Sequence, residues 1–141
     1  MKKLFIPFIV PIVLFIFFRL FFLNPDTLIH NFFSSYGFTL SPKPIETETV
    51  ILPTKLTPVY ENYNVIQKKA GLDISPYLSK KVKRYTYEVV NFPFQTDGKV
   101  LANALIYKNK IIAADIMTTS LDGFMLSPAD EVFKNSDLLD K

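Results

Sequence analysis

Carboxylates are the side chains of this chain with the widest scope for chemistry. The 141 residues include no Cys and one His, which excludes cysteine nucleophiles, Cys-based zinc sites and sites that need two imidazoles. Two carboxylates on either side of a sugar bond can act as the acid and base of a glycosidase. Six acids are candidates for such a pair, but no spacing in the sequence joins any two of them: Asp73, Glu88, Asp97, Asp115, Asp122 and Asp130. We therefore predict no catalytic residue, no metal site and no cofactor.

Asp115 stands out among these acids because it interrupts an apolar run at residues 111–118. One interpretation makes it a site acid on a face of small residues. The other makes it a strand-end acid that pairs with a basic group or faces water. We favour the second, because structural ion pairs perturb acids as often as functional sites do.

A denser set of amide, phenol, acid and basic side chains lies between residues 63 and 91. Such groups can line a recognition groove. They can also form an internal hydrogen-bond network, with Asn64, Gln67 and Arg84, that ties the second helix to the first long strand. The second interpretation is favoured. With Asp115 added, the candidate binding or structural residues are Tyr63, Asn64, Gln67, Asp73, Tyr77, Lys80, Arg84, Tyr85, Tyr87, Asn91 and Asp115.

The basic part of this set, from Lys80 to Arg84, adjoins two tyrosines and has the composition of a nucleic-acid patch. The charge distribution argues against that partner. The net charge of +3 comes from Lys2, Lys3 and Arg19, so residues 24–141 are neutral. We predict a solvated strand end, or a weak contact with anionic lipid headgroups.

Helix and strand signals then indicate what positions these side chains. Asn24 and Pro25 begin a helix that ends near Gly37, and Thr57 and Pro58 begin a second that ends at Gly71, with Asn24 and Thr57 as caps. Strand-like runs occupy residues 46–52, 82–92, 100–107 and 111–118. The order predicts an α+β domain, with an antiparallel sheet of about four strands, a C-terminal meander and two helices packed on one face.

The last hairpin decides which way Asp115 faces. A two-residue turn at Asn109 and Lys110 pairs Ala104 with Asp115 and Leu105 with Ala114. Asp115 then shares a face with small residues such as Ala104. A shift of one residue exchanges the two faces.

The N-terminal segment, residues 4–23, is apolar except for Pro7, Pro11 and Arg19. Twenty apolar residues span a bilayer core of about 30 Å, so we predict an uncleaved, single-pass signal-anchor. Lys2 and Lys3 place the N-terminus in the cytoplasm, and Arg19 reaches the outer headgroups. A cleaved signal, which lacks its small-residue site here, and a buried core helix are the alternatives. Residues 24–126 are then an extracytoplasmic domain, and residues 127–141 a polar tail with a short helix.

Three stretches of motif carry a family resemblance. They are Tyr63-Asn64-x-x-Gln67 with Gly71-x-Asp73-Ile74-Ser75-x-Tyr77, then Lys80-x-Val82-x-Arg84-Tyr85-Thr86-Tyr87-x-Val89-x-Asn91-Phe92-Pro93, and finally Leu105-Ile106-Tyr107 with residues 111–115 and Leu121-Asp122-Gly123-Phe124-Met125. Over residues 36–126 the chain resembles the bacterial family "domain of unknown function 4830". The resemblance implies a small, N-terminally anchored exported protein and carries no activity.

Two positions depart from the family pattern. Ser79 stands where Gly is expected, which predicts a changed loop because Ser tolerates positive φ poorly. Ala113-Ala114-Asp115 replaces a Gly-Gly-Asp-like sequence, which argues against a close approach of a ligand to the backbone there.

We therefore expect a membrane-anchored, extracytoplasmic domain that binds a protein, a peptide or an envelope component and does no catalysis. Its partners would be the lipid bilayer, through residues 4–23, and this ligand, but not nucleic acid. The alternatives are a small carboxylate-based hydrolase of envelope material and a modulator of an exported peptidase.

Overall fold

The computed structural model describes residues 6–22 and 24–134. Its helices are α1 (Ile6–Phe22), α2 (Pro25–Ser34), α3 (Pro58–Lys69), the 3₁₀ turn η1 (Ser75–Tyr77) and α4 (Glu131–Lys134). Its strands are β1 (Glu46–Ile51), β2 (Lys81–Glu88), β3 (Val100–Tyr107), β4 (Lys110–Thr118) and β5 (Met125–Leu126).

The five strands form one antiparallel sheet in the order β1-β2-β3-β4-β5. The predicted α+β class and the C-terminal meander are confirmed. The predicted strand count of about four falls short by β5, whose two residues are too few to produce a periodic pattern.

The two longer helices of the domain begin at the predicted prolines, but only one of them is capped as predicted. Asn24 Oδ1 accepts a hydrogen bond from the Asp26 N–H at 3.0 Å. Thr57 is the N-cap residue of α3, yet its side chain makes no capping bond. The start of α3 therefore depends on Pro58 rather than on the Thr57 hydroxyl.

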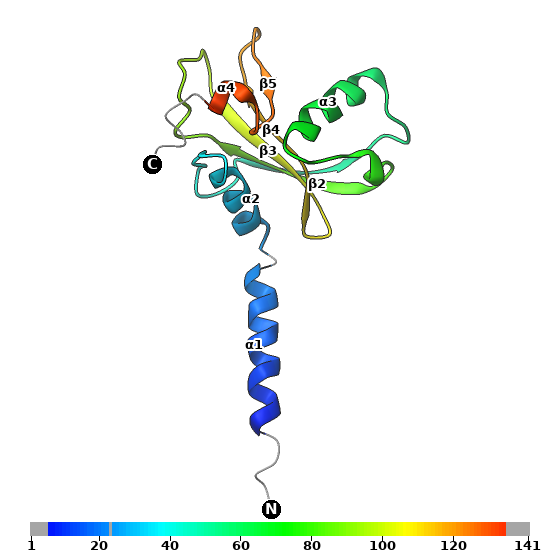
Figure 1. Cartoon of the computed structure of the whole chain (residues 1–141), viewed down its shortest axis with the longest axis vertical. Coiled ribbons are helices and arrows are strands. Elements are labelled where there is room, and N and C mark those ends of the chain that lie inside the picture. Colours follow the sequence, from blue (N-terminus) through cyan, green and yellow to red (C-terminus); the bar gives the residue numbers. More distant parts are fainter. Residues whose placement is uncertain (1–5, 23, 135–141) are drawn as a thin grey trace, which may run out of the picture.

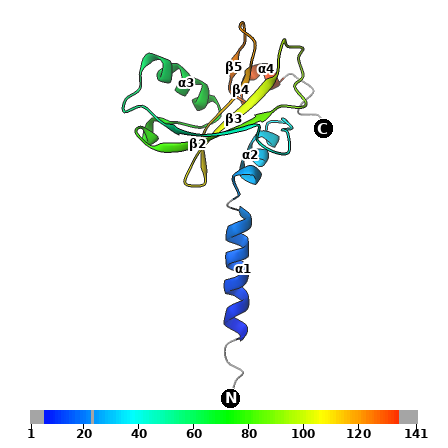
Figure 2. The ribbon, with the colours of Figure 1, turned by 180° about the vertical axis from the view of Figure 1, so that it is seen from behind.

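The prediction that both helices pack on one face of the sheet was wrong. Figures 1 and 2 show the sheet between α2 and α3. Ile29 and Phe33 of α2 pack in a core with Ala102 and Ala104 of β3. The tyrosines of α3 pack with a second cluster that includes Leu105. Strand β3 carries apolar side chains on both of its faces, so both faces must be covered.

The predicted register of the last hairpin was also wrong. The turn is at Lys108 and Asn109, whose φ angles are 46° and 61°, and two positive φ angles are typical of a type I′ turn. A bulge beside Leu105 then shifts the pairing. Asp115 lies opposite Asn103 instead of Ala104. It therefore faces α3 and not the small-residue face.

Helix α1 extends away from the domain (Figure 1). Within residues 6–22 and 24–134, no helix combines the length and the apolar character needed to cross a membrane. Part of the predicted anchor, residues 4–23, lies outside the described residues, and so do Lys2 and Lys3. The side chain of Arg19 is not described either.

The core continues past the predicted domain limit at residue 126. Phe133 of α4 is 3% exposed and belongs to the core on the α2 face. Its ring lies edge-on to Phe38, with 5.1 Å between the ring centroids. The residues after 126 therefore contribute to the fold at least as far as Phe133.

Candidate functional site

A cleft of about 620 Å³ lies between α3 and the sheet, on the face opposite α2. Its walls are largely apolar, and its polar groups come mainly from the strands. The lining residues are Glu46, Val50, Leu52, Val59, Tyr60, Asn62, Tyr63, Ile66, Arg84, Thr86, Leu101, Asn103, Leu105, Asp115, Met117 and Met125. This volume is in the usual range of ligand pockets, about 300–1,000 Å³.

One row of polar residues crosses the strands at the floor of this cleft. Glu46, Thr86, Asn103 and Asp115 are successive cross-strand partners in β1, β2, β3 and β4. Thr86 Oγ1 donates to Asn103 Oδ1 at 2.8 Å, and Asn103 Nδ2 donates to Asp115 Oδ2 at 2.9 Å. These bonds hold the Asp115 carboxylate in one orientation.

Asp115 is 2% exposed, and burial raises the pKa of its carboxyl to about 6. Hydrogen bonds from Asn103 and Tyr63, and the charge of Arg84, act in the opposite direction. The Tyr63 hydroxyl lies 3.4 Å from Asp115 Oδ1, which makes this a weak bond. Burial and the carboxylate both raise the pKa of Tyr63 well above its ordinary value. Tyr63 is thus a neutral hydrogen-bond donor in the cleft.

Arg84 is the cation of this site and is held from the side of β1. Its Nη2 lies 2.5 Å from Glu48 Oε2 and 3.8 Å from Glu46 Oε2. Its Nε is buried and has no hydrogen-bond partner among the described residues. A buried donor without a partner costs about 1–3 kcal/mol. A ligand oxygen that receives a hydrogen bond from Arg84 Nε would remove this cost and so favour binding.

Asn64 and Gln67 have structural roles, although the buried Gln67 Nε2 also has no hydrogen-bond partner among the described residues. Asn64 Nδ2 donates to Asp73 Oδ1 at 2.8 Å, and its Oδ1 accepts from the Ile74 N–H at 2.9 Å. Gln67 Oε1 accepts from the Ala114 N–H at 2.6 Å. These bonds tie α3 to the loop that follows it and to β4. These bonds differ from the expected network, which led to the first long strand and included Arg84, because neither residue bonds to Arg84.

Tyr87 and Asn91 lie on the other side of the sheet or beyond its end. The Tyr87 hydroxyl donates to Asp26 at the start of α2. Asn91 accepts from the Thr39 N–H at 2.7 Å and donates to the Gly37 carbonyl at 2.8 Å. Tyr87 thus fixes α2 onto β2, and Asn91 fixes the loop after α2 onto the segment that follows β2.

The remaining candidates also lie outside the cleft. Tyr85 is on the α2 face, and Lys83 Nζ lies 5.7 Å from its ring centroid. Tyr77 packs edge-on to Tyr107 at 5.5 Å between ring centroids. Lys80 is exposed. Of the eleven predicted site residues, the structure therefore brings only Tyr63, Arg84 and Asp115 together in the cleft.

Sequence reasoning missed Glu46, Thr86 and Asn103. Asn103 carried the same signal as Asp115, because it is a polar residue in the middle of an apolar strand. Only the register of the sheet shows that the two interruptions are neighbours.

Comparison with known proteins identifies a family. The family model described as "Domain of unknown function (DUF4830)" matches residues 32–116. The chain belongs to this family. The DUF4830 match includes Tyr63, Arg84 and Asp115, and it ends before the cleft methionines Met117 and Met125. No curated protein and no solved structure matches the chain.

The structure also resolves one departure from the DUF4830 pattern. Ser79 has a φ of 64°, a left-handed conformation that glycine adopts without strain. Ser79 thus occupies a backbone conformation suited to glycine.

Proposed function

We propose that this protein is a non-catalytic binding domain whose cleft between α3 and the sheet receives an extended peptide segment. The observation that carries the proposal is the cleft itself, with apolar walls around a polar row. Apolar pockets with a few fixed polar groups are typical of recognition sites.

The position of β1 favours a peptide among the ligands considered. Among the described strands, β1 lies at the edge of the sheet and pairs only with β2. Glu46 and Val50 of this edge strand also line the cleft. A peptide that adds to a free strand edge gains main-chain hydrogen bonds and places alternate side chains in the adjacent pocket.

The charges favour a peptide with a basic residue. The carboxylates of Glu46, Glu48 and Asp115 surround a single guanidinium, that of Arg84. A lysine or arginine side chain of the peptide complements this excess of negative charge.

A hydrolase is less well supported by the same geometry. Asp115 is almost fully buried, and both of its oxygens already accept hydrogen bonds, from Asn103 and Tyr63. A general acid or base needs its oxygen within reach of the substrate. These contacts favour binding over catalysis.

We further propose that residues 4–23 anchor the chain in the cell membrane, with the N-terminus in the cytoplasm and the domain outside. Twenty helical residues reach about 30 Å. Within α1, the large apolar side chains between Val10 and Phe18 are 52–69% exposed, which is the arrangement that lipid contact requires. Helix α1 leads into α2, and the cleft lies on the opposite face of the sheet from α2.

Site-specific photo-cross-linking in membranes tests the binding proposal. A photoreactive residue in place of Asn62 lies in the cleft, and one in place of Val65 lies on the exposed part of the same helix, outside it. We expect the probe at position 62 to capture a polypeptide that the probe at position 65 does not. Met117→Trp, which fills the cleft, should abolish this capture.

Two results would reject the proposal. One is equal capture at both positions, or capture that Met117→Trp leaves unchanged. The other is a captured glycan or lipid at position 62, which would replace the peptide by another ligand class.

A further inference from the structure

Five exposed lysines gather at one end of the sheet, at the β3–β4 turn and the start of β2. We define this basic surface as Lys80, Lys81, Lys83, Lys108 and Lys110. In the described part of the chain, none of these five lysines forms an ion pair, whereas Lys69 and Lys99 pair with Asp130 and Glu88.

Two tyrosines lie beside these lysines, Tyr85 on the α2 face of the sheet and Tyr107 on the α3 face. Lys83 Nζ lies 5.7 Å from the ring centroid of Tyr85, and Lys108 Nζ lies 5.4 Å from that of Tyr107. Tyrosine is enriched at the headgroup level of membranes, because its ring is apolar and its hydroxyl is polar. Lysines beside tyrosines are therefore a combination suited to a bilayer surface.

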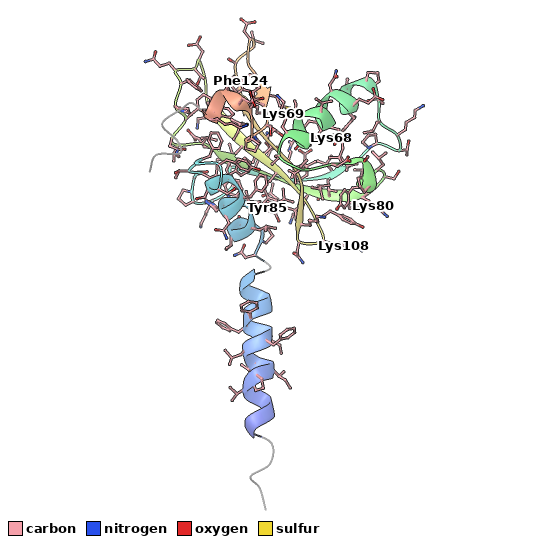
Figure 3. The ribbon with its side chains drawn as sticks, in the orientation of Figure 1. Lys68, Lys69, Lys80, Tyr85, Lys108 and Phe124 are labelled. Carbon is pink, nitrogen blue, oxygen red and sulfur yellow. The ribbon has the colours of Figure 1, made fainter. Side chains whose placement is uncertain are left out.

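The basic surface and helix α1 lie on the same side of the domain. In Figure 3, Lys80, Tyr85 and Lys108 lie on the side of the domain from which α1 extends, and Lys68, Lys69 and Phe124 lie on the opposite side. The bond from the Tyr87 hydroxyl to Asp26 fixes the first turn of α2 onto β2. The chain therefore enters the domain next to the strand that carries Lys83 and Tyr85.

We propose that the basic surface docks on the anionic lipid headgroups of the bilayer that holds residues 4–23. This inference rests on the proposed anchor, but it is independent of the cleft. The charge of residues 24–141 is balanced overall, so the surface is a local excess. Lysines near an anionic leaflet each add to binding, and salt screens this attraction. Docking would hold the cleft on the side that faces away from the membrane.

The test uses the full-length chain reconstituted in vesicles. The chain has no Trp, so Tyr107→Trp introduces one fluorophore at the basic surface, and Val65→Trp introduces one on the exposed side of α3. The vesicles contain either phosphatidylcholine alone or phosphatidylcholine with 30% phosphatidylglycerol, in each case with brominated chains that quench Trp fluorescence. We expect quenching of the Trp at position 107 only in the anionic vesicles, and its loss in high salt.

Lysine variants supply the decisive comparison. In the Tyr107→Trp chain, Lys108→Gln with Lys110→Gln should lower the ratio of docked to undocked domain about twenty-five-fold, because each lysine contributes about five-fold near an anionic surface. The matched control, Lys68→Gln with Lys69→Gln on the opposite side, should leave this ratio unchanged.

The outcomes separate the contact from the anchor. A chain that resists alkaline extraction from the vesicles, but whose Trp at position 107 is equally quenched in both lipids or insensitive to the Lys108 and Lys110 changes, overturns the headgroup contact alone. A chain that floats only with anionic vesicles and is released by salt overturns the anchor and supports the contact. A chain that floats with neither overturns both.

Discussion

The two faces of the sheet are built from the same strands but are covered to different extents. On the α2 face, Ile29 and Phe33 pack over Ala102 and Ala104, and Phe133 extends the layer. On the α3 face, the helix packs over the end of the sheet that contains Leu105. The cleft begins at this cluster, whose Leu105 also lines it, and continues along the same face. The α2 face is thus a core, and the α3 face combines a core with a binding surface.

Polar residues follow the same division. The hydroxyl of the buried Tyr87 on the α2 face donates to Asp26, and this bond fixes a helix. On the α3 face, Thr86, Asn103 and Asp115 form a row that borders a cleft. A polar group that only fastens two elements is structural, whereas a row of polar groups beside an open apolar wall is able to meet a ligand. Burial alone does not distinguish these cases.

Neighbouring residues of β4 test the contrast most strongly. Ile116 is fully buried on the α2 face, and Met117 lines the cleft on the other. We expect Ile116→Ala to lower the free energy of unfolding by about 2–5 kcal/mol, because it leaves a cavity in a packed core. Met117→Ala should cost less than about 1.5 kcal/mol. Urea unfolding measures both, and equal losses would show that the two faces are equally packed.

The pH dependence of stability tests whether the α3 face buries a carboxyl group. Asp115 has a pKa raised from 3.8 to about 6, so the folded state holds its proton more tightly than the unfolded state. Its contribution to stability is therefore present below about pH 4, falls as the pH rises to about 6, and is constant above. The shift corresponds to a change of as much as about 3 kcal/mol.

Asp115→Asn removes this dependence, because the amide does not ionise. Relative to the unsubstituted chain, the variant should gain stability between pH 4 and pH 6, measured by urea unfolding at each pH. The lowered pKa of Asp73, about 2, is common to both chains and cancels in the difference. Asp97→Asn, at an exposed acid, is the control. A difference for Asp115→Asn that does not vary with pH would contradict the burial of a titrating group.

The smallest effect concerns the loop that leads from η1 into β2. Ser79 has a φ of 64°, and a side chain in this conformation costs about 1–2 kcal/mol. Ser79→Gly removes the strain but increases the entropy of the unfolded chain. We expect a net gain of about 0.5–1 kcal/mol in the free energy of unfolding, measured by urea titration. Ser79→Ala retains a Cβ atom and should give no such gain. If both variants behave alike, the backbone there is not strained.

The elements of this protein could be predicted from the sequence because their signals are local. Asn24, Pro25 and Pro58 begin helices where expected, and alternation marks β2, β3 and β4. The family could be predicted as well, from motifs that lie close together in the chain. The network of Asn64 with Asp73 was within reach of sequence reasoning, since nine residues separate them.

Only the tertiary structure decided which residues form the site. The turn at Lys108 and Asn109, together with the bulge that follows it, turns Asp115 toward α3. A displacement of one residue reverses every side chain of a strand. The bulge supplies this displacement, whereas moving a two-residue turn by one position changes the pairing by two residues and keeps each side chain on its face. The side on which α3 packs depends on the apolar content of the whole sheet. For these reasons the sequence determined the parts and the family of this protein, and the packing of the strands determined the cleft.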